Sequence, residues 1–167
     1  MPHGPDRHHD RRDLAELSGY YHPLMFAPSR DQARQFFFDS WRKYRAGETL
    51  SALEAVALQV ILLHPEYHAL FDAPERNLDR DYAPENGALN PFLHLSLHLA
   101  IEEQLSIDQP PGIRTAFDQL RAKTGAEHDA KHALLECLAE TIWQAQRANA
   151  APDQALYLEC VERKLRS

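Results

Sequence analysis

The sequence predicts an all-α fold, a helical bundle with additional short helices, on three observations. Apolar residues recur at helical spacing through most of the chain after Pro28. Residue types that begin or end helices, such as Ser, Asn, Pro and Gly, stand between these apolar stretches. No stretch of useful length shows the apolar–polar alternation of a strand. The length of 167 residues favours one domain with a substantial core.

The beginning of the chain differs from the rest. Residues 1 to about 24 are rich in Pro, His, Arg and Asp and show no sustained period. We expect them to form a mobile tail, disordered or extended. A helical domain is expected over residues 25–167, and the metal ligands predicted below all lie in it.

The first helices are predicted from their end signals. Ser29 can cap a helix that carries an aromatic cluster, expected to be core, and ends near Gly47. The segment Ser51-Ala-Leu-Glu54 fits a capping box for a second helix, which continues to Leu63. Pro65 then kinks or restarts the helix within the segment HPEYH.

The second half of the chain begins with a predicted irregular connection over residues 72–89. Asn90 and Pro91 are a suitable cap and first-turn pair for the next helix, which runs to about Ile107. A Pro-Pro-Gly segment ends that helix. The remaining helices are expected at about 113–123, 126–147 and 153–165.

The composition excludes several classes of protein. A net charge of −7 argues against general binding to nucleic acid or to anionic membranes, both of which favour a basic surface. No apolar run reaches the roughly 18–20 residues that span a bilayer, and the N-terminus lacks the apolar core of a signal peptide. Cys137 and Cys160 lie far apart and form no metal-binding CxxC pair. A reducing, cytoplasmic location is therefore the simplest expectation.

Histidine is the unusual feature, because six of the ten histidines form three H-x-x-x-H pairs. Two separate helices carry the pattern H-x-x-x-H-x-x-x-E, whose members lie one turn apart on the same side of the helix. Burying such groups without partners costs roughly 1–3 kcal/mol each, so we expect a compensating partner. The predicted metal ligands are His64, His68, His94, His98, Glu102, His128, His132 and Glu136.

The spacing of these residues favours two ions. One triplet spans about 12 Å along its helix, which is too far for every member to reach one ion. Two ions some 3.5–4 Å apart, joined by bridging carboxylates, remove this difficulty. Imidazole together with carboxylate suits iron, manganese or zinc, and we expect iron, two ions per chain. Glu54 is interpreted as a capping residue, and a ligand role for it is left open.

Two resemblances follow from these residues. The steps His98 to Glu102 and His132 to Glu136 resemble those of hemerythrin-like di-iron proteins. This likeness implies a hemerythrin-like or ferritin-like bundle in which the two glutamates bridge the irons. From about Met25, the segments that begin MFAPSRDQARQFFF, NPFLHLSLHLAIEEQ and ECLAETIWQAQR look like the proteobacterial domain-of-unknown-function family eighteen forty-one. That family implies no particular activity.

We therefore expect a non-haem di-metal protein that binds, senses or activates a small oxidant such as dioxygen or nitric oxide. Whether it is an oxidoreductase is left open, and no redox or protein partner is assigned. The alternative is a structural or storage zinc protein without redox chemistry. Two further alternatives are a metal-free network of His–Glu pairs and a zinc hydrolase with Glu103 as its base.

Overall fold

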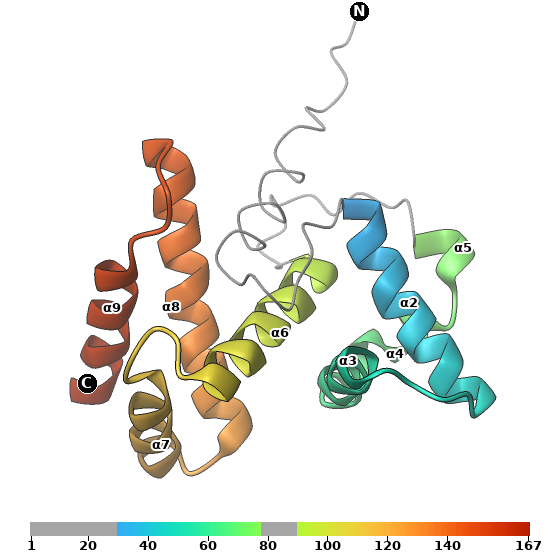
Figure 1. The fold of residues 1–167 in the computed structure, drawn as a ribbon, viewed down its shortest axis with the longest axis horizontal. Coiled ribbons are helices and arrows are strands. Elements are labelled where there is room, and N and C mark those ends of the chain that lie inside the picture. The colour runs from blue at the N-terminus through green and yellow to red at the C-terminus, as the bar shows by residue number, and fades with distance from the viewer. Residues whose placement is uncertain (1–29, 78–89) are drawn as a thin grey trace, which may run out of the picture. The chain divides into compact units, whose positions relative to one another are not determined.

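The computed structural model describes residues 30–77 and 90–167, and within these ranges every regular element is a helix (Figure 1). The all-α prediction is confirmed. The chain divides into two compact units, which are described separately. Among the described residues, the first unit ends at Leu99 and the second begins at Ala100, within one continuous helix. The predicted tail over residues 1–24, the Ser29 cap and most of the predicted 72–89 connection lie outside the described residues.

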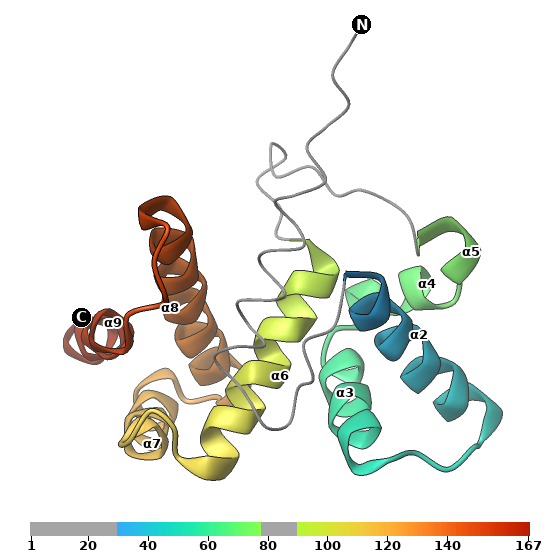
Figure 2. The same ribbon diagram turned by 45° about the horizontal axis from the view of Figure 1, so that its top comes forward.

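The first unit contains several helices before the long α6. Helix α2 packs against α3, and α4 also contacts α2 (Figure 2). One short helix, α5, lies within the segment predicted to be irregular, so that prediction is wrong at this point. Its first residue is a proline, whose backbone angle already suits a first helical turn. The bounds are α2 Arg30–Ala46, α3 Ala52–Leu62, η1 Pro65–Tyr67, α4 His68–Phe71, α5 Pro74–Asn77 and α6 Pro91–Ile107.

The connection between α2 and α3 follows the predicted capping box. Ser51 Oγ accepts from the Glu54 backbone N–H at 3.2 Å, and the Ser51 N–H donates to Glu54 Oε1 at 2.9 Å. Glu54 Oε2 also lies 2.8 Å from Lys43 Nζ. Hydrogen bonds from Lys43 and from the Ser51 backbone lower the pKa of Glu54 to about 2. Glu54 thus ties α3 to α2 as a structural group.

The core of the first unit combines aromatic and aliphatic side chains. The rings of Phe38 and Phe71 meet edge to face at 5.2 Å, and Phe38 also contacts Phe92 at 5.7 Å. Such pairs add to the roughly 1.5–3 kcal/mol that burial of each large apolar side chain contributes. The N-terminal part of α6 belongs to this core through Phe92, Leu95 and Leu99. The predicted aromatic core is confirmed, and it fixes how α6 lies beside the end of α3.

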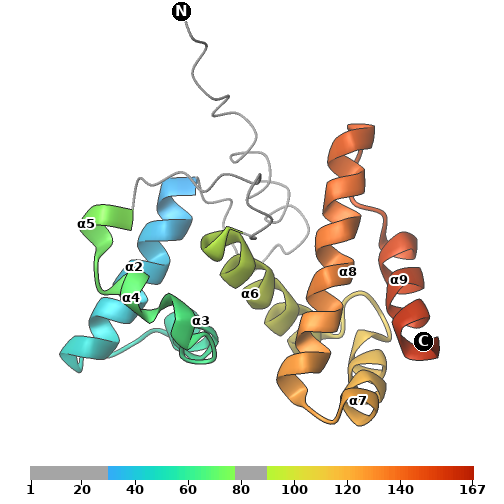
Figure 3. The same cartoon turned by 180° about the vertical axis from the view of Figure 1, so that it is seen from behind.

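The second unit consists of the C-terminal part of α6 and three further helices. These are α7 Ile113–Thr124, α8 Glu127–Ala148 and α9 Gln154–Arg166, each within one or two residues of its predicted bounds. All three pack on one another, with α9 alongside α8 (Figure 3). Gly125, at φ 78°, makes the left-handed turn between α7 and α8.

A disulfide between Cys137 and Cys160 joins α8 to α9, with a Cα–Cα distance of 5.6 Å. The two cysteines were predicted to be separate and reduced, and the disulfide differs from this prediction. Spacing along the chain does not show the pairing, because the two residues meet only when α9 packs on α8. In the described ranges, no helix has the length and apolar character needed to cross a membrane.

Candidate metal centre

The C-terminal end of α3 is built by a proline and two histidines. Pro65 has no N–H and cannot continue the hydrogen bonds of the helix, so the last carbonyl groups of α3 need other donors. The Val60 carbonyl accepts from His64 Nδ1 at 2.7 Å. The Ile61 carbonyl accepts from His68 Nε2 at 2.9 Å. Each imidazole therefore caps the helix through one ring nitrogen.

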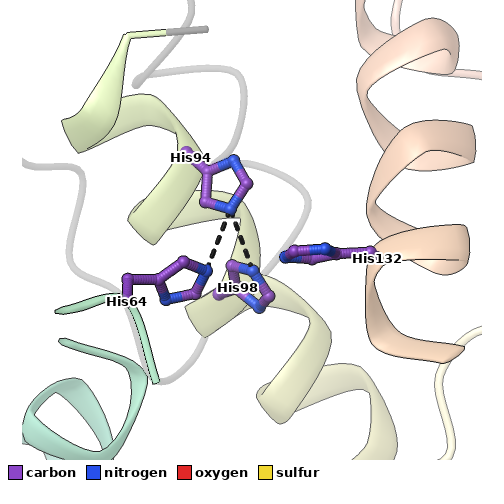
Figure 4. Close-up of side chains that lie close together, drawn as sticks. All are labelled: His64, His94, His98 and His132. Carbon is purple, nitrogen blue, oxygen red and sulfur yellow. Dashed lines mark hydrogen bonds between the residues drawn. The ribbon is translucent and has the colours of Figure 1, made fainter. Parts of the chain in front are cut away.

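Three imidazoles meet beside this helix end. His64 follows α3, whereas His94 and His98 stand one turn apart on α6. His94 Nε2 lies 3.1 Å from His64 Nε2 and 3.1 Å from His98 Nε2 (Figure 4). The possible ligand nitrogens of the three rings lie within 4.8 Å of one another. All three residues belong to the first unit, and we call them the tri-histidine cluster.

The nitrogen spacing of the tri-histidine cluster fits a metal ion. With a metal–nitrogen distance of about 2.0–2.1 Å, two ligand nitrogens on one ion are about 2.9–3.4 Å apart, depending on the bond angle. The two observed separations of 3.1 Å lie in this range. Small side-chain adjustments would bring the three nitrogens to one cation.

His64 is already oriented as a nitrogen ligand. Because a backbone carbonyl only accepts hydrogen bonds, the His64 Nδ1 that contacts Val60 carries a proton. In the neutral ring, Nε2 then has the lone pair, and this is the nitrogen that faces His94. Metal-binding histidines are commonly held in this way by a backbone carbonyl. His64 and His98 are also buried, with 1% and 2% of their surface exposed.

Tyr67 lies next to the tri-histidine cluster. Its ring is nearly parallel to that of His64, at 12° and 5.7 Å, and nearly perpendicular to that of His94, at 74° and 6.0 Å. Burial raises the pKa of Tyr67, and the charge of Glu66 adds to this effect. Tyr67 was not among the functional residues predicted from the sequence. The sequence feature that could have identified Tyr67 is its position between the two histidines of the segment HPEYH.

His68 is the member of the HPEYH pair that the structure does not bring into the cluster. Its ring centroid lies 4.7 Å from that of Trp41, and its Nε2 caps the Ile61 carbonyl. Trp41 is itself fixed by a hydrogen bond from its Nε1 to Asp72 at 2.8 Å. The helix-end role therefore involves both histidines of the pair, but only His64 also faces other imidazoles.

The two predicted glutamate ligands form ion pairs with lysines of the second unit. Lys131 Nζ lies 2.6 Å from Glu102 Oε1 and 3.1 Å from Glu127 Oε1. Burial lowers the pKa of Lys131, but the hydrogen bonds and charges of Glu102 and Glu127 outweigh this and leave the pKa raised. Glu136 pairs with Lys164, and its side chain is 66% exposed. Neither Glu102 nor Glu136 belongs to the tri-histidine cluster.

The second predicted histidine pair lies on α8. His128 and His132 stand one turn apart, with ring centroids separated by 4.2 Å. Both belong to the second unit, and Figure 4 also draws His132. Their role as metal ligands stays a prediction from the sequence. Lys131 stands between the two histidines in the sequence and was also not predicted, although its four-residue spacing to Glu127 indicates an ion pair.

Fold and site together define an all-α helical protein with a histidine cluster that could hold a metal ion. A family model described as Domain of unknown function (DUF1841) matches residues 29–163. This match spans most of the chain, and the protein belongs to the DUF1841 family. The family resemblance noted in the sequence is thereby confirmed, whereas the likeness to hemerythrin stays a prediction. No curated protein and no solved structure matches the chain significantly.

Proposed function

We propose that this protein binds one transition-metal ion through the Nε2 atoms of His64, His94 and His98. The observation that carries the proposal is the convergence of three imidazoles beside the C-terminal end of α3, where His94 Nε2 lies 3.1 Å from the Nε2 atoms of both His64 and His98. Two facing imidazole nitrogens share at most one proton, and two facing lone pairs repel each other. One cation can accept the lone pairs of all three rings at once.

The donor set limits the chemistry of the proposed centre. Imidazole nitrogens suit iron, zinc, copper and nickel, whereas magnesium and calcium prefer oxygen. Three protein ligands leave a coordination position for water or a small molecule, as in reactive sites and unlike closed structural sites. We propose iron as the ion and a small oxidant such as dioxygen or nitric oxide as the molecule bound at the open position. Zinc in the same ligands would hold water there.

A di-iron centre is the second candidate. It is supported by the position of Glu102 one turn beyond His98 on α6 and of Glu136 one turn beyond His132 on α8. Both glutamates would have to leave their lysine partners to bridge two ions. For Glu102 this would leave the nearly buried Lys131 ammonium with fewer carboxylate contacts, which is costly. A single ion requires no such rearrangement and is the favoured proposal.

Metal binding is tested on the full chain, stripped with a chelator and reconstituted with Fe²⁺ without oxygen or with Zn²⁺. We expect one tightly bound ion per chain. His94→Gln and His98→Gln should each weaken binding by more than the roughly 10–100-fold that loss of a supporting partner costs. His68→Gln is the matched control, because its amide can still donate to the Ile61 carbonyl, and it should keep the affinity of the unsubstituted protein.

The number of ions separates the two candidates. Two irons per chain with oxo-bridge absorption in air would favour the di-iron centre. Ions held by other histidines would remain in the His94 and His98 variants, so the metal content of these variants is the background to subtract from that of the unsubstituted protein. The proposal is contradicted if no ion binds above that background, or if both variants bind as well as the unsubstituted protein. A His132→Gln variant tests the prediction from the sequence that His132 is a metal ligand.

A further inference from the structure

The one-turn helix η1 places an aromatic ring against the tri-histidine cluster. Pro65 starts η1 and Tyr67 ends it, and the Tyr67 backbone N–H donates to the His64 carbonyl at 2.9 Å. This short turn places the Tyr67 side chain beside His64, the residue that precedes Pro65. The result is the near-parallel contact between the phenol and imidazole rings, with an angle of 12° between their planes.

The contact restricts the orientation of His64. Its Nδ1 is held by the Val60 carbonyl, which fixes one point of the ring but still permits rotation about that hydrogen bond. The Tyr67 ring lies nearly parallel to the imidazole, with the ring centroids 5.7 Å apart, and it also contacts His94 of α6 at a steep angle of 74°. Tyr67 is partly buried and packs against the core of the first unit. The Tyr67 ring is therefore held in place by the core and can limit rotation of the His64 imidazole.

We propose that Tyr67 is a positioning residue of the metal centre, which keeps the His64 imidazole turned so that Nε2 faces the cluster. This inference rests on the proposed metal site. It assigns the effect to the ring of Tyr67 and not to its hydroxyl, because the ring face lies along the imidazole. Substitution of Tyr67 by phenylalanine should therefore preserve metal binding, whereas substitution by an aliphatic residue of similar size should weaken it.

Cobalt substitution provides the test, because the visible spectrum of Co²⁺ reports the geometry of its ligands. Full-length protein and the variants Tyr67→Phe and Tyr67→Leu are titrated with Co²⁺. We expect Tyr67→Phe to match the unsubstituted protein in affinity and spectrum. Tyr67→Leu should bind Co²⁺ about two- to twelve-fold more weakly, the range that corresponds to aromatic pairing, with shifted visible bands.

A second measurement reports the state of His64 in the metal-free protein. The exchange of the His64 Nδ1 proton with solvent, measured by NMR, should be faster in Tyr67→Leu and unchanged in Tyr67→Phe. The control is Tyr44→Leu, since Tyr44 belongs to the same unit but is 44% exposed and packs on Trp41. That variant should leave both the cobalt spectrum and the proton exchange unchanged.

The outcomes separate the two proposals. If the unsubstituted protein binds Co²⁺ and Tyr67→Leu keeps its affinity and spectrum, the positioning role is wrong and the metal site stands. A phenolate charge-transfer band in the Fe³⁺ protein that disappears in Tyr67→Phe would also overturn it, because Tyr67 would then be a ligand. If the unsubstituted protein binds no Co²⁺, the metal site and the role of Tyr67 both fall.

Discussion

Substitution of Glu102 by glutamine removes one carboxylate charge while keeping the size of the side chain. In the second unit, Glu102 Oε1 lies 2.6 Å from Lys131 Nζ, whose side chain is only 11% exposed. If Glu102 serves the ion pair, Glu102→Gln should destabilise the protein and leave metal binding through the three histidines unchanged. If Glu102 is a metal ligand, the same variant should lose metal.

The expected loss of stability follows from the geometry of the ion pair. Opposite charges about 4 Å apart attract by about 4 kcal/mol at an effective dielectric constant of about 20, and desolvation of the lysine offsets much of this. Glu127 remains at 3.1 Å from Lys131, so the ammonium keeps one carboxylate. We expect a loss of about 1–2 kcal/mol, between the values for exposed pairs and for broken buried pairs.

Urea unfolding at neutral pH measures this loss, and a double-mutant cycle with Lys131→Met isolates the interaction. The coupling energy should be about 1 kcal/mol. Glu127→Gln is the matched control and should cost less, because the Glu127 side chain is 60% exposed. Metal content per chain should be the same in Glu102→Gln and Glu127→Gln as in the unsubstituted protein. Unchanged stability together with reduced metal content in Glu102→Gln would refute the reasoning.

Three further predictions concern stability. Because the pKa of Glu54 is lowered from 4.5 to about 2, its ionised form stabilises the protein above about pH 4.5, and this contribution is lost as the pH falls towards 2. Glu54→Gln should remove that pH dependence, about 1–2 kcal/mol after allowance for solvent screening of Lys43, in urea titrations at several pH values. Reduction of the disulfide, whose cysteines are separated by 23 residues, should cost about 3 kcal/mol and lower Tm by about 6–12 °C, whereas a Cys137→Ala/Cys160→Ala protein should not respond to the reductant. Phe37→Ala, at a site 1% exposed, should cost about 3–5 kcal/mol in denaturant unfolding.

The helices could be predicted because their ends depend on neighbouring residues. Asn90 Oδ1 accepts from the Phe92 backbone N–H at 2.9 Å, and Asp153 Oδ1 accepts from the Ala155 N–H at 2.9 Å. The Asn90 cap was predicted from residue type and position alone, and for the last helix the sequence predicted the start at about residue 153. The short helix α5 was missed, because four residues are too few to show an apolar period.

The candidate site could be predicted only in part, for the same reason. His94 and His98 share a helix face by their spacing, and the proline after His64 marks a helix end, so all three residues stand out in the sequence. Their meeting depends on how α6 packs against α3, through apolar contacts such as those of Phe92. The contact of Tyr67 with His94 depends on the same packing, and the contact of Lys131 with Glu102 depends on the packing of the second unit.

The four-residue step from His98 to Glu102 also shows why spacing alone does not identify a ligand. Residues one turn apart share a helix face whether they bind one ion or serve two neighbouring groups. On α6, His98 faces another imidazole. Glu102, about 6 Å further along the helix axis, contacts Lys131. A lysine ammonium and a metal cation compete for the same carboxylate, and a carboxylate engaged by one is costly to transfer to the other. The Lys131 ion pair therefore favours a metal centre of imidazoles alone, and removal of its charge in Lys131→Met is the change most expected to release Glu102 towards a second ion.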